Sequence, residues 1–353
     1  MLAIRATTGM PMKVIFHIGH STPVTPVLRD RLAWAWPQLV RKGTLLPALA
    51  APAQAWTLRQ VLPPPAADRG PPPPDLAAEH ALLHADHTTP QDSLQAQIQH
   101  LTPATLLLFP AFPASFGEAE EAALAALAQK LNKAEVHLYC ALPRPDLHLE
   151  RLLTKRIEQG GALDDLNREV LSLLDSPHVD YRQLLTVWRG HFPKATLHLS
   201  AAAGIETDIA QYFETFGLPV LPPLATECTP MALRRAFLDP VRLANHLFPG
   251  DLDFRSNLLA QFDTVVLPYD NQIELFGTNL RRQLYDAFAP VAEELAQHND
   301  GIDVFTELKA MLQPRPTALE TLRPPLLRAI PRFSFGRFDP RLLTLRKYLK
   351  KTL

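Results

Sequence analysis

The sequence predicts an α/β fold: a parallel sheet flanked by helices in the first part of the chain, followed by a mostly helical second half. Three observations predict it. Short apolar runs bounded by turn residues recur as far as about Ser200, and such runs are typical of buried strands. Helical stretches of about 10 to 15 residues lie between them, an alternation typical of parallel sheets. Beyond Pro219 no comparable apolar run follows, so we expect helices there.

The first expected strand is Val14–Ile18. It leads through a turn into a helix that should begin at Pro26 and end at Arg41. Thr25 and Pro26 form a favourable N-cap and first helical residue, because the missing N–H of proline falls where helices leave donors unpaired. Pro37 should interrupt this helix near its end.

Three further strands are expected to neighbour Val14–Ile18 in one parallel sheet, because each is apolar along its length. They are Thr105–Phe109, Glu135–Cys140 and Thr196–Ser200. The expected helices are about Gln91–His100, Glu118–Leu131, Asp146–Gln159, Leu163–Leu174, Asp180–Phe192, Met231–Leu247, Asp251–Gln261 and Thr278–Gln297.

We expect one large α/β domain over residues 13–312, after an N-terminal extension (1–12) and before a basic, proline-broken tail (313–353). Residues 62–75, LPPPAADRGPPPPD, should form an extended surface loop, because proline excludes helix interiors and central strands. The tail has ten Lys or Arg residues against two acidic ones, about +8, which leaves about −9 for the rest. This contrast predicts that the tail docks on the acidic remainder, on a second copy or on another protein.

Composition excludes several classes of protein. Apolar residues make up 47% of the chain and charged residues 20%, which is typical of folded rather than disordered proteins. The formal net charge of −1 makes nucleic acid an unexpected partner. Cys140 and Cys228 are too few for a disulfide framework and fit a reducing environment. No apolar run is long enough to span a membrane and no signal peptide is evident, so we expect a cytoplasmic protein.

The stretch FHIGHSTPVTP, residues 16–26, has the layout of a phosphate-binding P-loop: an apolar strand, a glycine, a turn of small hydroxyl residues and a helix start. In such loops, backbone N–H groups and the helix N-terminus hold the phosphate. His20 lies just past the strand, where ligands bind in open α/β sheets, with local hydrogen bonding as the alternative role. His17, within the strand, is expected to be a packed histidine.

Three stretches carry a resemblance to a known family. They are FHIGHSTPVTPVLRDRLAWAWPQLVRKGTLLP, VHLYCALPRPDLHLERLLTKRIEQG and VDYRQLLTVWRGHFPKATLHL, the last followed by DIAQYFETFGL. Their order resembles that of the bacterial sulfotransferase-like family, P-loop-fold enzymes that transfer sulfonate from phosphoadenosine phosphosulfate (PAPS). The resemblance spans about residues 13 to 300. It implies PAPS as cofactor and a hydroxyl compound, such as a glycan, as acceptor.

The resemblance implies a remodelled donor loop. The family's lysine is replaced by Ser21 and its glycine by Pro23, so a cation and a backbone donor are missing. His20 is the catalytic candidate, because it is the nearest replacement for the cation. Without the lysine and the full set of donors, we expect little ordinary sulfonate transfer. The implied cofactor-binding residues of the loop are Gly19, Ser21, Thr22 and Thr25.

The implied 3′-phosphate site is also altered. The family's arginine falls near Ala141 or Leu142, and its helix serine falls at Arg151. Arg144 and Arg151 are the remaining candidates to hold this phosphate, because a guanidinium matches its geometry. A plain surface role is the alternative. Two functions therefore stay open: a sulfotransferase-like enzyme, and a non-catalytic relative that binds a ligand or a partner.

A metal site is the weaker hypothesis. His80, His84 and His87 are spaced four and three residues apart, so they would share one face of a helix near Glu79. Imidazoles in this arrangement can bind zinc. The spacing is not that of HExxH, and solvated or capping histidines are the alternative, so no metal is assigned.

Overall fold

The computed structural model describes residues 11–19, 24–45, 103–109, 118–201, 204–219, 234–263, 272–297, 305, 307–318, 327, 330, 333–334 and 337–352. The chain divides into two compact units. Unit 1 comprises Met1–Pro143, Asp180–Pro230 and Val291–Thr306, and unit 2 comprises Arg144–Val179, Met231–Pro290 and Glu307–Leu353. This division differs from the expected domain 13–312 and separate tail 313–353, because unit 2 combines the tail with earlier segments.

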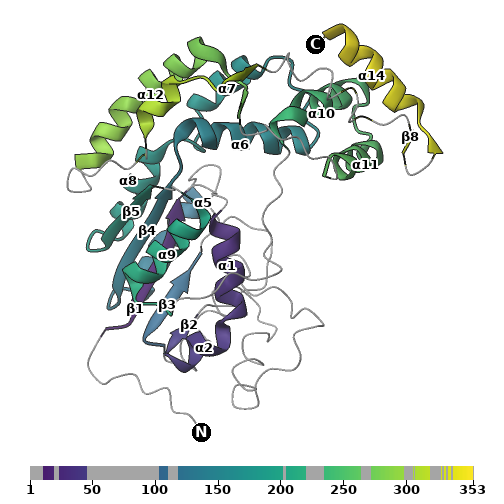
Figure 1. Ribbon diagram of the computed structural model, residues 1–353. Helices are drawn as coiled ribbons and strands as arrows, with labels where there is room; N and C mark the ends of the chain where they lie inside the picture. Colours follow the sequence, from purple (N-terminus) through teal and green to yellow (C-terminus); the bar gives the residue numbers. More distant parts are fainter. Residues whose placement is uncertain are drawn as a thin grey trace. The chain divides into compact units, whose positions relative to one another are not determined.

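Unit 1 is built on a parallel five-stranded sheet, which confirms the predicted α/β class (Figure 1). The strand order is β2-β3-β1-β4-β5. The strands are β1 (Lys13–Gly19), β2 (Thr44–Leu45), β3 (Thr105–Leu108), β4 (Glu135–Leu142) and β5 (Thr196–Ala201). All four predicted strands form, in one sheet, and the two-residue strand β2 was not predicted.

The central strand of this sheet is β1. It pairs with β4 from Lys13 opposite Glu135 to Gly19 opposite Ala141, and its first four residues pair with β3 on the other side. All five residues of the run 14–18 are buried. A strand with a neighbour on each side and a helix layer on each face needs a mostly apolar sequence, and His17 is the one polar residue of this run.

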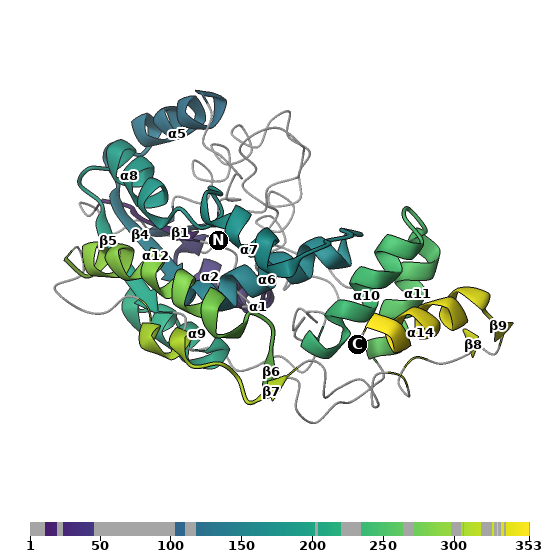
Figure 2. The same ribbon diagram turned by 90° about the horizontal axis from the view of Figure 1, so that it is seen from above.

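Helices cover both faces of the sheet in unit 1. On one face α1 (Val24–Trp34) and α9 (Ile205–Phe216) share a core with Ile15 of β1. On the other face Phe16 packs against Trp188 of α8 (Tyr181–His191), at 5.1 Å between ring centroids. Helix α5 (Glu118–Lys130) lies beside α8, and Figure 2 shows the sheet between this pair and α9.

The first helix begins earlier than predicted. Helix α1 starts at Val24, so Pro26 is its third residue rather than its first. A proline is tolerated there because the first four N–H groups of a helix have no intrahelical acceptor. The predicted interruption is present: the helix breaks at Ala35, and α2 (Trp36–Arg41) continues with Pro37 in its first turn.

Unit 2 is mostly helical, but two short strand pairs correct the expectation that strands end at Pro219. β6 (Ile273–Glu274) pairs in parallel with β7 (Thr317–Ala318), and β8 (Phe333–Ser334) pairs antiparallel with β9 (Arg337–Phe338). The helices with residues in this unit are α6 (Pro145–Glu158), α7 (Leu166–Leu174), α10 (Arg235–Leu247), α11 (Leu252–Asp263), α12 (Gly277–Gln297, up to Pro290), η4 (Leu308–Leu312) and α14 (Pro340–Thr352).

The C-terminal helix α14 is part of the core of unit 2. Leu342, Leu345 and Leu349 are at most 1% exposed and pack in one cluster with residues of α10 and α11. Their spacing of three and four residues places them on one face of the helix. The basic C-terminal segment is therefore no appendage: its last helix contributes apolar side chains to a shared core.

Two expectations lie outside the described residues, namely the proline-rich segment 62–75 and the helix Gln91–His100. Among the helices that are described, none is both long and apolar enough to cross a membrane.

The position of α14 makes a stability prediction. Leu345→Ala should destabilise the protein by about 2–5 kcal/mol, the usual cost of truncating a fully buried leucine. Leu343→Ala, on the exposed side of the same helix (36% exposed), should cost less than about 0.5 kcal/mol. Urea unfolding of both variants measures the difference. Equal, small effects would mean that α14 is not required by the core.

Candidate functional site

The candidate site lies at the carboxyl ends of β1 and β4. The chain leaves β1 toward β2 on one side of the sheet and leaves β4 toward β5 on the other. In open α/β sheets, ligands bind just outside the point where neighbouring connections diverge in this way. The point is marked by Gly19, which pairs with Ala141.

Only glycine fits at position 19. Its φ is +126°, and a Cβ atom there would lie 2.8 Å from the carbonyl oxygen of Ala141. Four residues, 20–23, then connect β1 to α1, so the start of α1 follows the carboxyl end of the central strand. Of the predicted loop residues, the structure describes Gly19 and Thr25, whereas His20, Ser21 and Thr22 lie outside the described residues.

Thr25 is held by a buried histidine. The Nε2 atom of His17 lies 3.3 Å from the Thr25 hydroxyl oxygen. The His17 ring is stacked on Phe109, at 4.9 Å between centroids, and also contacts the rings of Tyr139 and Tyr212. His17 is 6% exposed, which confirms the packed strand histidine that the sequence predicts.

Two buried tyrosines beside His17 are polar groups that the sequence analysis missed. Burial raises the pKa of Tyr139 to about 12, with a further rise from the charge of Asp208, against an opposing effect of Ser200. Burial likewise raises the pKa of Tyr212. Both phenols therefore stay protonated at neutral pH and can donate hydrogen bonds. The Tyr212 hydroxyl has no hydrogen-bond partner among the described residues.

The position of these polar residues was only partly visible in the sequence. Asp208 and Tyr212 lie four residues apart in DIAQYFETFGL, on one face of α9, and both are buried. Asp208 and Tyr212 can be recognised in the sequence because they are polar residues on the otherwise apolar face of a helix. Tyr139 stands inside a continuous apolar run, where nothing distinguishes it from a packing residue.

Helices α1 and α9 are joined by an ion pair. The Nη1 atom of Arg31 donates to Oε2 of Glu206 at 3.0 Å, and a second contact joins Nη2 to Oε1. Arg31 is 2% exposed, so its charge needs this partner. The pair fixes α1 against α9, the two helices that follow β1 and β5.

The predicted 3′-phosphate residues Arg144 and Arg151 belong to unit 2. Arg144 precedes α6 and donates to both carboxylate oxygens of Asp146, from Nε at 2.7 Å and from Nη2 at 3.2 Å. Arg151 is partly buried, and loss of solvation lowers its pKa. Both side chains are partly buried, and neither position decides between a phosphate contact and a plain surface role. A phosphate at Arg144 would have to compete with the Asp146 carboxylate.

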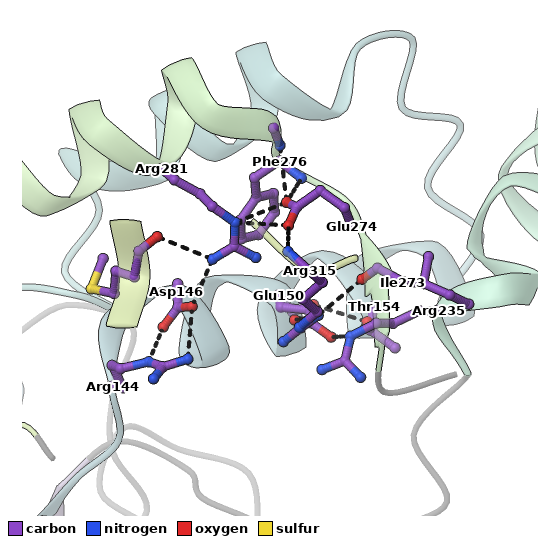
Figure 3. Close-up of polar contacts among 12 residues, drawn as sticks. Arg144, Asp146, Glu150, Thr154, Arg235, Ile273, Glu274, Phe276, Arg281 and Arg315 are labelled. Carbon is purple, nitrogen blue, oxygen red and sulfur yellow. Dashed lines mark hydrogen bonds and ion pairs between the residues drawn. The ribbon is translucent and has the colours of Figure 1, made fainter. Parts of the chain in front are cut away.

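Asp146 is one end of an arginine–carboxylate network in unit 2 (Figure 3). Arg281 of α12, 2% exposed, bridges it to β6: Nη1 lies 3.3 Å from Asp146, and Nε lies 2.9 Å from both Glu274 oxygens. The same Nη1 donates to the carbonyl oxygen of Met311 at 3.2 Å. A single guanidinium thus ties together α6, α12, β6 and η4.

The network continues from Glu274 to a second carboxylate. The backbone N–H of Arg315 donates to Glu274 at 2.6 Å, and its side chain pairs with Glu150 of α6 at 3.1 Å, where Arg235 of α10 also binds. Burial raises the pKa of Glu274, but hydrogen bonds from Arg281 and from three backbone N–H groups outweigh this, and the net shift is downward. The charged side chains of this network are thus paired with one another inside unit 2, which indicates that the network has a structural role.

The part of the chain that the structure describes contains no group of three or more His, Cys, Asp or Glu side chains arranged to hold a metal ion. His80, His84 and His87 lie outside it. Cys140 is fully buried, and burial raises its pKa, so its thiol is not an activated nucleophile.

The geometry of Gly19 predicts a specific cost of substitution. Gly19→Ala should destabilise the protein by about 1–3 kcal/mol, because alanine would be strained at this φ and would contact the Ala141 backbone. Gly190→Ala is the matched control: beyond its own helix backbone, no atom of the described residues lies within 4 Å of the added methyl group, and the change should be neutral or stabilising by up to about 1 kcal/mol. Thermal unfolding of the two variants distinguishes them, and equal melting temperatures would contradict the expectation.

The network predicts that Arg281 is indispensable to unit 2. Arg281→Met should cost about 3–5 kcal/mol, because it leaves Asp146 and Glu274 without their buried partner. Arg182→Met, which breaks an ion pair with Glu294 that is about half exposed on both sides, should cost less than about 1 kcal/mol. Denaturant unfolding at pH 7 measures both.

The same pair of variants has a pH dependence. The folded-state pKa of Glu274 is depressed, so its contribution to stability is present above the unfolded value of about 4.3 and is lost as the pH falls below it. The unmodified protein should therefore lose stability between about pH 5 and pH 3 more steeply than Arg281→Met. Parallel curves for the two proteins would exclude this role of Arg281.

Comparisons with protein-family models, curated proteins and solved structures give no match for this chain. Its function is therefore inferred from the geometry at the carboxyl edge of the sheet and from the loop sequence.

Proposed function

We propose that this chain is a sulfotransferase-like protein with a remodelled donor loop, in which Gly19–Thr25 faces the 5′-phosphate of PAPS. The observation that carries the proposal is Gly19: a left-handed glycine at the carboxyl end of the central strand, separated by four residues from the start of a helix. This is the arrangement in which a backbone turn and a helix N-terminus approach a phosphate. The acceptor would be a hydroxyl compound such as a glycan.

The loop sequence limits what this site can do. Sulfonate transfer develops negative charge on the bridging oxygen, and Ser21 stands where a lysine would neutralise that charge. Pro23 and Pro26 have no N–H to donate. Loss of one preorganised donor of this kind costs about 3–4 kcal/mol of transition-state stabilisation. His20 is the catalytic candidate for the missing cation, and Ser21, Thr22 and Thr25 are the candidate hydroxyl contacts.

Weak anion binding is compatible with the first turn of α1. The Val24 and Thr25 N–H groups have no acceptor within the helix, and the helix dipole adds about 0.3–1 kcal/mol for a negative charge. The family resemblance gives Arg144 and Arg151 as the candidates for the 3′-phosphate, and both belong to unit 2, so no joint site with the loop of unit 1 is assigned. Arg144 would exchange Asp146 for the phosphate, which reduces the gain in affinity.

A second candidate function is favoured by the same substitutions. Ser21 and Pro23 remove the charge and a donor on which transfer depends, while the sheet and α1 are retained. A non-catalytic relative that uses the fold to bind a ligand or a protein partner would show this combination. PAPS would then not be its cofactor.

Calorimetric titration with adenosine 3′,5′-bisphosphate separates the two candidates. We expect sub-millimolar binding to the unmodified protein, and at least about tenfold tighter binding to Ser21→Lys/Pro23→Gly, because the repair restores a cation and a donor. Ser172→Lys, which adds a lysine to the exposed face of α7, controls for net charge and should bind as the unmodified protein does.

Two outcomes would count against parts of the proposal. If neither the unmodified protein nor the repaired variant binds at millimolar ligand, the proposed donor site is wrong and the non-catalytic function remains. Turnover of PAPS by the unmodified protein at the rate of the repaired variant would show that Ser21 and Pro23 do not disable the loop.

A further inference from the structure

Two histidines face each other across β4 and β5, in the amino-terminal half of the sheet. His137 lies opposite Thr196 and His198 lies opposite Tyr139, so the two histidines are diagonal neighbours on one face. His137 Nδ1 and His198 Nε2 are 3.0 Å apart, and the rings are stacked at 5.3 Å between centroids. Phe216 of α9 packs edge-on against both rings, which restricts their orientation.

A carboxylate fixes which nitrogen of His137 carries the proton. Glu135 Oε1 lies 2.9 Å from His137 Nε2, and a carboxylate only accepts, so Nε2 is the donor. In the neutral ring Nδ1 then holds a lone pair that points at His198. A histidine whose outer N–H donates to a carboxylate while its other nitrogen stays open is the usual arrangement of a metal-binding histidine.

We propose that His137 and His198 form a cross-strand binding site for a divalent first-row transition metal ion, such as Zn²⁺ or Cu²⁺, with Glu135 as the outer carboxylate. Two imidazole nitrogens on one tetrahedral metal ion, each about 2.0–2.1 Å from it, lie about 3.4 Å apart. The observed 3.0 Å needs to open by only about 0.4 Å. Water supplies the other ligands, since the Glu135 side chain is 50% exposed and His198 is only partly buried.

The protons balance without an additional reactant. In the empty pair the His198 N–H at Nε2 points at His137 Nδ1. Metal binding moves that proton to His198 Nδ1 through solvent, and the neutral pair releases none. Lys13 of β1 lies close enough to His198 to act on it electrostatically. Lys13 of β1 opposes a cation at this place, and Glu135 offsets it.

The ion would fasten β5 to β4 at the end of the strands away from Gly19. It would therefore act on the stability of the sheet, independently of any ligand at the carboxyl edge. This separates it from the proposed donor site, and neither proposal depends on the other.

Calorimetric titration of the full chain with ZnCl₂ at pH 7.5 tests the site. His80→Asn/His84→Asn/His87→Asn serves as the background, so that zinc bound by those histidines is removed. In that background we expect one zinc site, weakened at least 100-fold by His198→Asn and about 10–100-fold by Glu135→Gln. His246→Asn, which replaces an exposed histidine, is the matched control and should leave affinity unchanged.

Zinc affinity that is the same with and without His198 would overturn the proposal, as would the absence of a zinc site in the background variant. If His198→Asn does not fold, the imidazole ¹⁵N resonances of the unmodified protein decide. Zinc should shift His137 Nδ1 and His198 Nε2 together, and shifts confined to other histidines would also overturn it.

Discussion

The pairing of β1 with β4 is the constraint on which unit 1 depends. The two strands run in register from Lys13 and Glu135 to Gly19 and Ala141, and their side chains form the middle of both apolar layers. Gly19 is the last residue of this pairing, and its backbone lies so close to Ala141 that no larger residue fits there. The position of α1, and with it the candidate site, follows from one strand pair and one glycine.

Unit 2 is organised by charge as well as by apolar contacts. Leucines of α14 and aromatic residues of α10 and α11 form its core, as at Phe237 and Phe262, whose rings are stacked at 4.0 Å. Buried ion pairs add little net stability over apolar residues of equal size, but a wrong arrangement leaves charges unpaired. Arg281 therefore acts mainly on the specificity of the fold of unit 2. Elements α6, β6 and η4 each offer an acceptor to its guanidinium, and an arrangement that separates one of them from Arg281 loses that contact.

Local patterns in the sequence were sufficient for the sheet and insufficient for the network. Each predicted strand is an apolar run between turn residues, so its state is encoded within about five to eight neighbours. Helix α1 starts two residues earlier than predicted, because proline is tolerated throughout the first turn of a helix and so does not identify the first helical residue. Arg281 and Asp146 are 135 residues apart, and no periodicity relates them. The same holds for His137 and His198, which only the register of β4 and β5 brings together.

The first turn of α1 is held in place by contacts within unit 1. Val24 is 4% exposed and belongs to the core cluster of α1 and α9, so the first helical side chain faces inward. The Thr25 hydroxyl is engaged by His17, and Pro26 has no N–H. The start of the helix is thus held by apolar packing and by a contact with a histidine. A helix anchored in this way does not depend on the residues of the preceding loop to keep its position, so under the proposed function Ser21 and Pro23 would alter the donor site and leave the sheet and α1 intact.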